Sequence, residues 1–194
     1  MTIGVGGSNA SIELDKIQDI TKGVQPIALA EYKLRIQKAV ALMNELNCKA
    51  IYLNAGTNLY YFTGTKWNPS ERMVGALLFE DESIEYIVPK FEDGTFKKFM
   101  QIEGSLNCWE EHESPYELLG AILKQKNIQN GSIAIDESAS YFLFDGVVKA
   151  NPNYEFTNAQ PITAGCRMQK SANEIAIIQQ AKEITMVVQK AVAR

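Results

Sequence analysis

The sequence predicts an α/β fold in which helices cover both faces of a mixed β-sheet, giving three layers. Stripes of apolar residues at the helical period alternate along the chain with short, continuous apolar runs that are typical of buried strands. Two of these runs, 74–79 and 84–88, are separated by the four polar residues 80–83, which predicts a hairpin. The hairpin makes the predicted sheet mixed rather than purely parallel.

The first long helix is predicted after Pro26 and ends at Asn47. Its apolar residues recur at the helical period and form one face, made of Tyr32, Ile36, Ala39, Val40, Met43 and Leu46. The apolar run 50–53 then predicts a buried strand, and residues 54–64 predict an aromatic-rich loop or a short helix.

Further helices and strands follow the hairpin. Ser114 is expected to cap a helix, since Pro115 suits the first helical position and Glu117 completes a capping box. The other expected elements are helical segments at 91–101 and 140–150 and strands at 105–109, 133–135 and 154–157.

The two ends of the chain differ in pattern. Residues 1–25 are glycine-rich at the start and weakly patterned, so we expect a flexible lead in which 12–20 is compatible with one or two amphipathic turns. Ser171 and Glu174 form a second capping box and open a helix. Its apolar face consists of Ile177, Ala181, Ile184, Val188 and Ala191. Such a face needs a partner, either in this domain or in sequence beyond residue 194.

Charge and composition exclude several classes of protein. Lys and Arg total 19 against 23 Asp and Glu, a formal charge of −4, and basic residues are scattered. We therefore expect no nucleic-acid partner. No apolar run approaches the length of a membrane span, and the N-terminus lacks the features of a secretory signal. A cytoplasmic protein without a membrane partner is expected.

The cysteines and the single histidine argue against a metal centre. Cys48, Cys108 and Cys166 are odd in number and far apart, which indicates reduced thiols rather than disulfides or a zinc site. His112 lies among glutamates, but consecutive side chains on an extended segment point in alternate directions. We expect a solvated loop there, and no metal or cofactor in this chain.

Three stretches of the sequence carry a family resemblance. They are Tyr32-x-x-Arg35, Asn58-Leu-Tyr-Tyr-Phe-Thr-Gly64 followed by Glu71-Arg72, and Arg167-Met-Gln-Lys-Ser-x-x-Glu-Ile-x-x-Ile-x-x-Ala181. In this order they resemble the creatinase/prolidase family, the metallopeptidases with a pita-bread catalytic domain. The resemblance spans about residues 30–194 and is greatest to bacterial Xaa-Pro dipeptidases and aminopeptidases.

The resemblance implies a domain organisation. The flexible lead at 1–25 precedes an N-terminal α/β domain at 26–165 with a ribonuclease H-like motif. Residues 166–194 are then the interdomain joint and the first helix of the catalytic domain. None of that domain's metal-binding motifs can be placed here, so this chain alone is expected to be inactive.

The resemblance also implies what the whole protein does. It would hydrolyse Xaa-Pro peptide bonds with two divalent metal ions (Mn, Co or Zn) held by the catalytic domain. The expected partners of this chain are that C-terminal catalytic domain and a second copy in a homodimer. The expected role of this domain is to shape the substrate entrance and the dimer.

Two residues are candidates for the substrate entrance, which the resemblance places at the active site of the partner subunit. Trp67 lies in a loop that resembles the family's lid, and an exposed aromatic suits a substrate rim. The planar guanidinium of Arg72 suits a substrate carboxylate, and creatinase-like relatives use an arginine from about this place. The alternatives are that Trp67 packs against its own domain and that Arg72 pairs with Glu71 or another neighbour.

Two other functions remain open. Domains of this fold also occur as non-catalytic protein-binding modules, as in histone chaperones. A creatinase-type amidinohydrolase, which acts on a small guanidino acid, shares the same N-terminal domain. An intact catalytic half beyond residue 194 would separate the binding module from the two enzymes.

Overall fold

The computed structural model describes residues 6–193, so the first five residues of the predicted lead lie outside the described residues. The chain divides into two compact units. One unit is residues 29–169, and the other combines residues up to 28 with residues from 170 onwards. Each unit is described by itself below.

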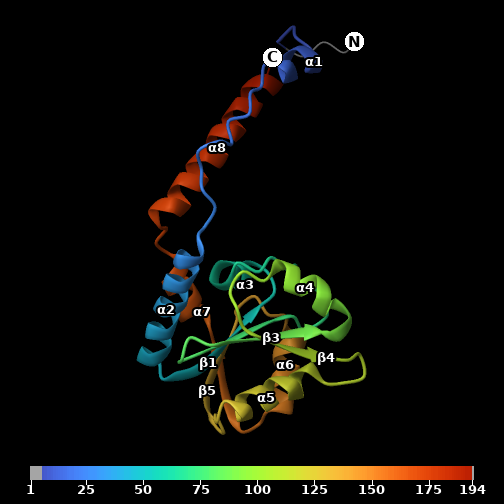
Figure 1. The fold of residues 1–194 in the computed structure, drawn as a ribbon, viewed down its shortest axis with the longest axis vertical. Helices are drawn as coiled ribbons and strands as arrows, with labels where there is room; N and C mark the ends of the chain where they lie inside the picture. The colour runs from blue at the N-terminus through green and yellow to red at the C-terminus, as the bar shows by residue number, and fades with distance from the viewer. Residues whose placement is uncertain (1–5, 194) are drawn as a thin grey trace. The chain divides into compact units, whose positions relative to one another are not determined.

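The larger unit is built on a six-stranded sheet in the order β4-β3-β2-β1-β5-β6 (Figure 1). The strands are β1 (Cys48–Asn54), β2 (Gly75–Phe79), β3 (Ile84–Pro89), β4 (Ser105–Trp109), β5 (Gly131–Ile135) and β6 (Tyr154–Asn158). β2 pairs antiparallel with both β1 and β3, whereas the β1–β5, β3–β4 and β5–β6 pairs are parallel. The predicted mixed sheet and its β2–β3 hairpin are confirmed.

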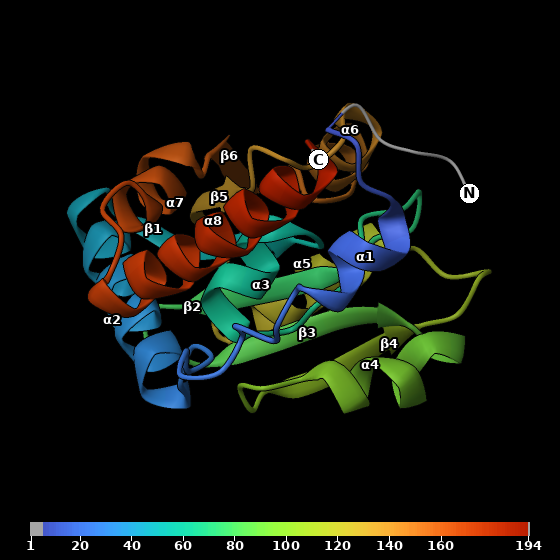
Figure 2. The same ribbon diagram turned by 90° about the horizontal axis from the view of Figure 1, so that it is seen from above.

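Helices cover both faces of this sheet, which confirms the three-layer prediction. They are α2 (Leu29–Glu45), α3 (Thr57–Thr63), the 3₁₀ turn η1 (Lys90–Glu92), α4 (Asp93–Phe99), α5 (Pro115–Gln125), α6 (Tyr141–Ala150) and α7 (Gln160–Arg167). Helices α2, α3, α4 and α7 contribute to the core on one face, and α5 and α6 to the core on the other. Figure 2 looks onto the first face and shows α3 and α4 in front of the strands.

Burial on both faces explains why the strands read as continuous apolar runs. In β1, Ile51 and Leu53 enter one core while Ala50 and Tyr52 enter the other, because successive side chains of a strand point to opposite faces. All four side chains are fully buried. A strand with one wet face would have alternated with polar residues instead.

The structure differs from the predicted helices in two places. Leu46 was expected on the buried face of the first helix, but α2 ends at Glu45 and Leu46 is 51% exposed. Helix α7 was not predicted, because only Ile162, Thr163 and Cys166 of its eight residues are buried. A helix this short shows too few periodic positions to be recognised from its pattern alone.

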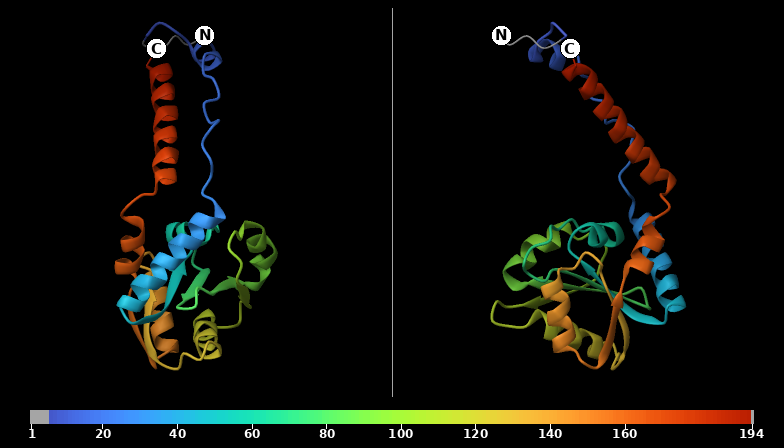
Figure 3. Two further views of the ribbon diagram at one scale, coloured as in Figure 1. Left: turned by 60° about the vertical axis from the view of Figure 1, so that its left-hand side comes forward. Right: turned by 180° about the vertical axis from the view of Figure 1, so that it is seen from behind.

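The smaller unit consists of α1 (Ala10–Asp15), α8 (Ala172–Val192) and the segment between α1 and residue 28. That segment runs alongside α8 in the opposite direction (Figure 3). The Gln180 side-chain amide donates a hydrogen bond to the Ile20 carbonyl. The predicted capping box at the start of α8 is present, with Ser171 and Glu174 bonding each other's backbone N–H.

The lead covers part of the apolar face predicted for α8. Ile177 and Ile184 are half-buried, whereas Val188 of the same predicted face is 42% exposed. No described side chain of α8 is fully buried. Among residues 6–193, no helix combines the length and the apolar character that a membrane crossing requires.

Candidate functional site

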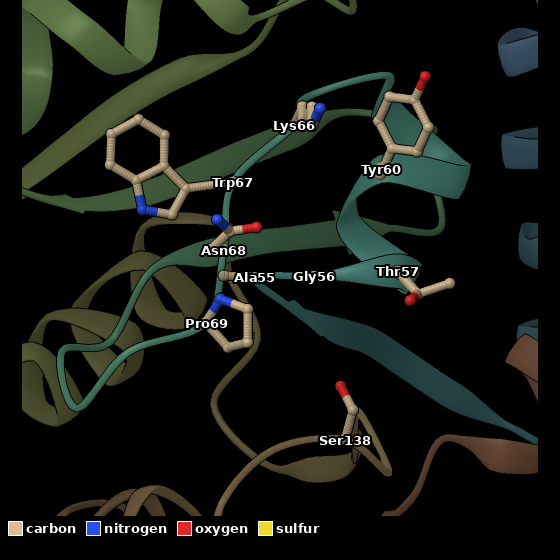
Figure 4. A pocket seen from close by; sticks show the side chains of 9 residues that line it. All are labelled: Ala55, Gly56, Thr57, Tyr60, Lys66, Trp67, Asn68, Pro69 and Ser138. Atoms are coloured by element: carbon tan, nitrogen blue, oxygen red, sulfur yellow. The ribbon is translucent and has the colours of Figure 1, made fainter. Parts of the chain in front are cut away.

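The candidate site is a pocket of about 510 Å³ beside the carboxyl ends of β1 and β5 (Figure 4). We call it the β1–β5 pocket. Its lining comes from the residues after β1, from α3, from the loop after α3 and from the turn after β5. The lining residues are Ala55, Gly56, Thr57, Tyr60, Lys66, Trp67, Asn68, Pro69 and Ser138.

The sheet topology accounts for the position of this pocket. β1 has a parallel neighbour, β5, on one side and an antiparallel neighbour, β2, on the other. The strand order reverses between β1 and β5, because β2, β3 and β4 continue the sheet on the β1 side and β6 continues it beyond β5. In open α/β sheets, ligands bind in the crevice outside the carboxyl ends of strands at such a switch point.

A buried carboxylate joins segments that adjoin the β1–β5 pocket. Asp136, directly after β5, is 2% exposed. Its oxygens accept hydrogen bonds from the Asn54 backbone N–H at 2.9 Å and from Asn58 Nδ2 at 3.0 Å. The Ser138 backbone N–H and Oγ each donate to it at 2.7 Å. The ends of β1 and β5 and the start of α3 thus meet at one acceptor.

The same asparagine connects α3 to α7. Asn58 Nδ2 also donates to Glu137 Oε1 at 3.1 Å, and Asn58 Oδ1 accepts from Arg167 Nη1 at 2.8 Å. Glu137 in turn accepts from Thr163 Oγ1 of α7 at 2.9 Å. Asn58 and Arg167 both belong to the stretches that resemble the family, but their contact was not foreseen, because they are 109 positions apart.

Trp67 lines the β1–β5 pocket and also packs on its own domain. Its ring centroid lies 5.3 Å from that of Phe96 and 6.2 Å from that of Phe99, both on α4. The side chain is half-buried. Trp67 therefore packs against its own domain, as the alternative prediction had it, and its indole also lines the β1–β5 pocket.

Arg72 lies outside the residues that line this pocket and is paired within its own chain. Its Nε–H and Nη2–H donate to the Glu111 carboxylate at 2.9 and 3.3 Å, and Nη1 pairs with Glu71. The guanidinium also lies 5.3 Å from the ring centroid of Phe91. Hydrogen bonding to Arg72 lowers the pKa of Glu111. The surface ion pair weighed as the alternative is thus present, and the structure does not bring Arg72 and Trp67 together.

Of the nine lining residues, sequence reasoning put forward only Trp67, and Tyr60 and Lys66 are two of those it missed. Both flank features that were recognised, since Tyr60 lies inside the 58–64 stretch and Lys66 directly precedes Trp67. Lys66 is the one charged residue in the lining. Adjacency to Trp67 in the loop was the signal that could have identified it.

The cysteines and His112 show no catalytic arrangement. Cys48 and Cys166 are buried, and desolvation raises the pKa of both thiols, that of Cys166 to about 11. Such thiols are protonated at neutral pH and are poor nucleophiles. His112 is exposed in the turn after β4. Within residues 6–193, no cluster of three or more His, Cys, Asp or Glu side chains could hold a metal ion.

Comparison with known families identifies the domain. Residues 35–169 match the family described as the Creatinase/Prolidase N-terminal domain. The chain belongs to this family. The match begins at Arg35 in α2 and ends just after α7, so it contains the whole sheet and the β1–β5 pocket.

A curated relative of this creatinase/prolidase N-terminal domain is much longer than the chain. The Bacillus subtilis (strain 168) protein named "Putative dipeptidase YkvY" is 26% identical over 151 residues, which are 77% of this chain and 41% of that protein. The chain therefore spans less than half the length of this relative.

Solved structures share the fold of the domain. A recombinant prolidase from Thermococcus sibiricus superposes with a TM-score of 0.70 at 22% identity, covering 83% of this chain and 42% of the prolidase. The N-terminal domain of an Xaa-Pro dipeptidase from Lactobacillus brevis gives a TM-score of 0.61 at 17% identity, covering 70% of this chain and 99% of that domain. At these identities the likeness concerns the fold.

Proposed function

We propose that this chain is the non-catalytic N-terminal domain of a metallopeptidase of the Xaa-Pro dipeptidase or aminopeptidase type. One observation carries the proposal. The chain covers 99% of a structure that consists of the N-terminal domain of an Xaa-Pro dipeptidase, but only 42% of the Thermococcus sibiricus prolidase. In the proposal, the catalytic residues of this protein lie in a segment that corresponds to the uncovered part of that prolidase.

The proposed role of this chain is a supporting one. In the proposal, two divalent ions (Mn, Co or Zn) would be held by the catalytic domain, where they would activate water and polarise the scissile carbonyl. This chain would contribute a rigid sheet that presents its loops to the substrate. A homodimer would place those loops at the partner's active site.

Trp67 and Arg72 are the proposed entrance residues. Trp67 is anchored on α4 by Phe96 and Phe99, so its indole is held rigidly enough to form one wall of an entrance. Arg72 would exchange Glu111 for a substrate carboxylate. Both carboxylates suit the same planar pair of N–H donors, so the exchange preserves the two-point geometry.

The experiment compares residues 1–194 with the product of the entire uninterrupted reading frame that begins at Met1. Hydrolysis of Ala-Pro is measured for both proteins in the presence of Mn²⁺. We expect turnover by the longer product and none by residues 1–194. A frame that ends at Arg194, or a longer product without Xaa-Pro hydrolysis, would overturn the proposal. The first result would favour a binding module, and cleavage of a guanidino acid would favour the amidinohydrolase.

A further inference from the structure

We infer that Asn130 is a site of spontaneous covalent modification, where the side-chain amide is lost and the main chain is partly rerouted through the side chain. The reactive pair is Asn130-Gly131, which ends the turn between α5 and β5. This turn precedes the amino end of β5, whereas the β1–β5 pocket lies beside its carboxyl end. The inference therefore goes beyond the proposed function and does not depend on it.

The reaction needs only water and the two residues themselves. The Gly131 backbone nitrogen attacks Asn130 Cγ, so that a new N–Cγ bond forms and the Cγ–Nδ2 bond breaks. The displaced nitrogen takes the proton of the Gly131 N–H and leaves as ammonia, and a cyclic succinimide remains. Water then opens this ring, and nothing is oxidised or reduced. Opening at Cγ gives aspartate with the ordinary main chain, and opening at the main-chain carbonyl carbon gives isoaspartate.

The structure leaves the Asn130 side chain unrestrained. Asn130 is exposed, lies outside the described helices and strands, and has no side-chain hydrogen bond within residues 6–193. Gly131 has no Cβ to crowd its nitrogen during the attack. It is also the first residue of β5, so ring closure requires only the end of that strand to open, which is the least costly part of an element to open.

Two related pairs in the larger unit are held inside helices. Asp93-Gly94 lies in α4 and Asp145-Gly146 lies in α6. A helical backbone fixes the position of the following nitrogen, so a ring could close only after the helix opens. The two carboxylates also pair with Lys90 and Lys149 at 3.3 and 2.7 Å, and an ionised carboxylate resists attack by a nucleophile. Asn130-Gly131, the one Asn-Gly pair in the sequence, has neither protection.

Asn127 provides a matched control in the same turn. It is also exposed, but the residue after it is Ile128. The Ile128 backbone N–H donates a hydrogen bond to the Leu123 carbonyl at 3.0 Å, so the nitrogen that would attack is engaged. The branched side chain of Ile128 further restricts access to that nitrogen. Of these two exposed asparagines, only Asn130 should react.

The products change the charge and the main chain directly before β5. Loss of the amide leaves a carboxylate, so the formal charge falls by one from −4. Isoaspartate also adds one carbon to the main chain ahead of a strand that pairs with both β1 and β6. Aspartate leaves the main chain unchanged. We therefore expect isoaspartate, but not aspartate, to weaken the start of β5.

The test incubates residues 1–194 beside a synthetic peptide of residues 124–133 until the peptide has lost its Asn130 amide. Trypsin cleaves after Lys126 and Lys149, so a single fragment of the protein contains both Asn127 and Asn130. Mass spectrometry of this fragment should show the gain expected when OH replaces NH2 at Asn130, with Asn127 intact. The aspartate and isoaspartate forms should elute separately. The reaction should become faster as the pH rises through neutrality, because the attacking nitrogen must lose its proton.

Two variants isolate the chemistry. Asn130→Gln keeps an amide but would have to close a larger ring, so it should stay intact throughout the incubation. Freshly purified Asn130→Asp carries the new charge on an ordinary main chain, so the incubated protein should unfold at a lower urea concentration than this variant.

Several outcomes would overturn the inference. They are an Asn130 amide that survives while the peptide reacts, equal loss at Asn127, or loss of the amide from Asn130→Gln at the same rate. An incubated protein as stable as Asn130→Asp would overturn the expected effect on β5. None of these measurements involves Xaa-Pro hydrolysis, so a failure here is distinguishable from a failure of the proposed function.

Discussion

At the scale of single residues, the Asn58 side chain links three ionisable residues of the site. It is 2% exposed, and its amide bonds to Asp136, Glu137 and Arg167, which belong to different parts of the chain. All three partners carry an ionisable group. Removing the amide would leave its buried or half-buried partners with one hydrogen bond fewer, and water cannot readily reach them to replace it. An unsatisfied buried polar group is costly in free energy.

We therefore predict that Asn58→Ala lowers the free energy of unfolding by about 2–3 kcal/mol. The measurement is urea unfolding followed by far-UV circular dichroism. Asn153→Ala is the control, because Asn153 is exposed in the turn before β6 and should change stability by less than about 0.5 kcal/mol. Equal stability of the two variants would show that the Asn58 bonds contribute little.

At the scale of elements, the helix caps were recognisable from sequence because they depend on residues three positions apart. Ser114 Oγ accepts from the Glu117 backbone N–H at the start of α5, and Ser171 does the same for Glu174 at the start of α8. The two helices differ in what else supports them. α5 buries Leu119, Ile122 and Leu123, whereas no described side chain of α8 is fully buried. The cap therefore represents a larger share of the support for α8.

Ser171→Ala is expected to destabilise α8 by about 1 kcal/mol, the usual cost of losing a capping hydroxyl. Amide hydrogen exchange of α8 should become about fivefold faster, while exchange in the sheet stays unchanged. Ser114→Ala, which removes the equivalent capping hydroxyl from α5, is the control. It should leave hydrogen exchange in α8 unchanged, because α5 belongs to the larger unit. Faster exchange throughout the chain in the Ser171 variant would contradict this view of α8.

At the scale of the whole molecule, the two compact units differ in how they are stabilised. The larger unit has two buried cores separated by the sheet. The smaller unit consists of two helices and an extended segment, and α8 is at most half-buried along its length. Local opening needs less free energy where few apolar contacts are lost.

We predict that residues 29–169 fold without the other segments. Their urea midpoint, followed by the fluorescence of Trp67 and Trp109, should match that of the entire chain within about 0.3 M, because both cores are retained. In the entire chain, amides of α8 should exchange before those of β1. A truncated protein that loses the cooperative transition would show that the larger unit depends on the smaller one.

The sequence by itself determined the α/β alternation, the hairpin and both helix caps. These features depend on residues close together in the chain, such as the apolar stripe of α2 or Ser171 and Glu174, so their pattern is visible without the fold. The stretches at 58–64 and 167–181 likewise indicated the family before any contact was known. The helix α7 was missed because its eight residues contain too few turns to show a period.

Only the tertiary structure decided the arrangement of the site. The Asn58–Arg167 contact joins residues 109 positions apart, and Lys66 becomes a pocket residue only because the loop after α3 lies beside the turn after β5. Arg72 pairs with Glu111, which lies 39 positions away in the chain, and is not among the residues that line the pocket. Local periodicity specifies which elements form. The packing of those elements around the sheet decides which side chains meet, because that choice depends on burial summed over the whole chain.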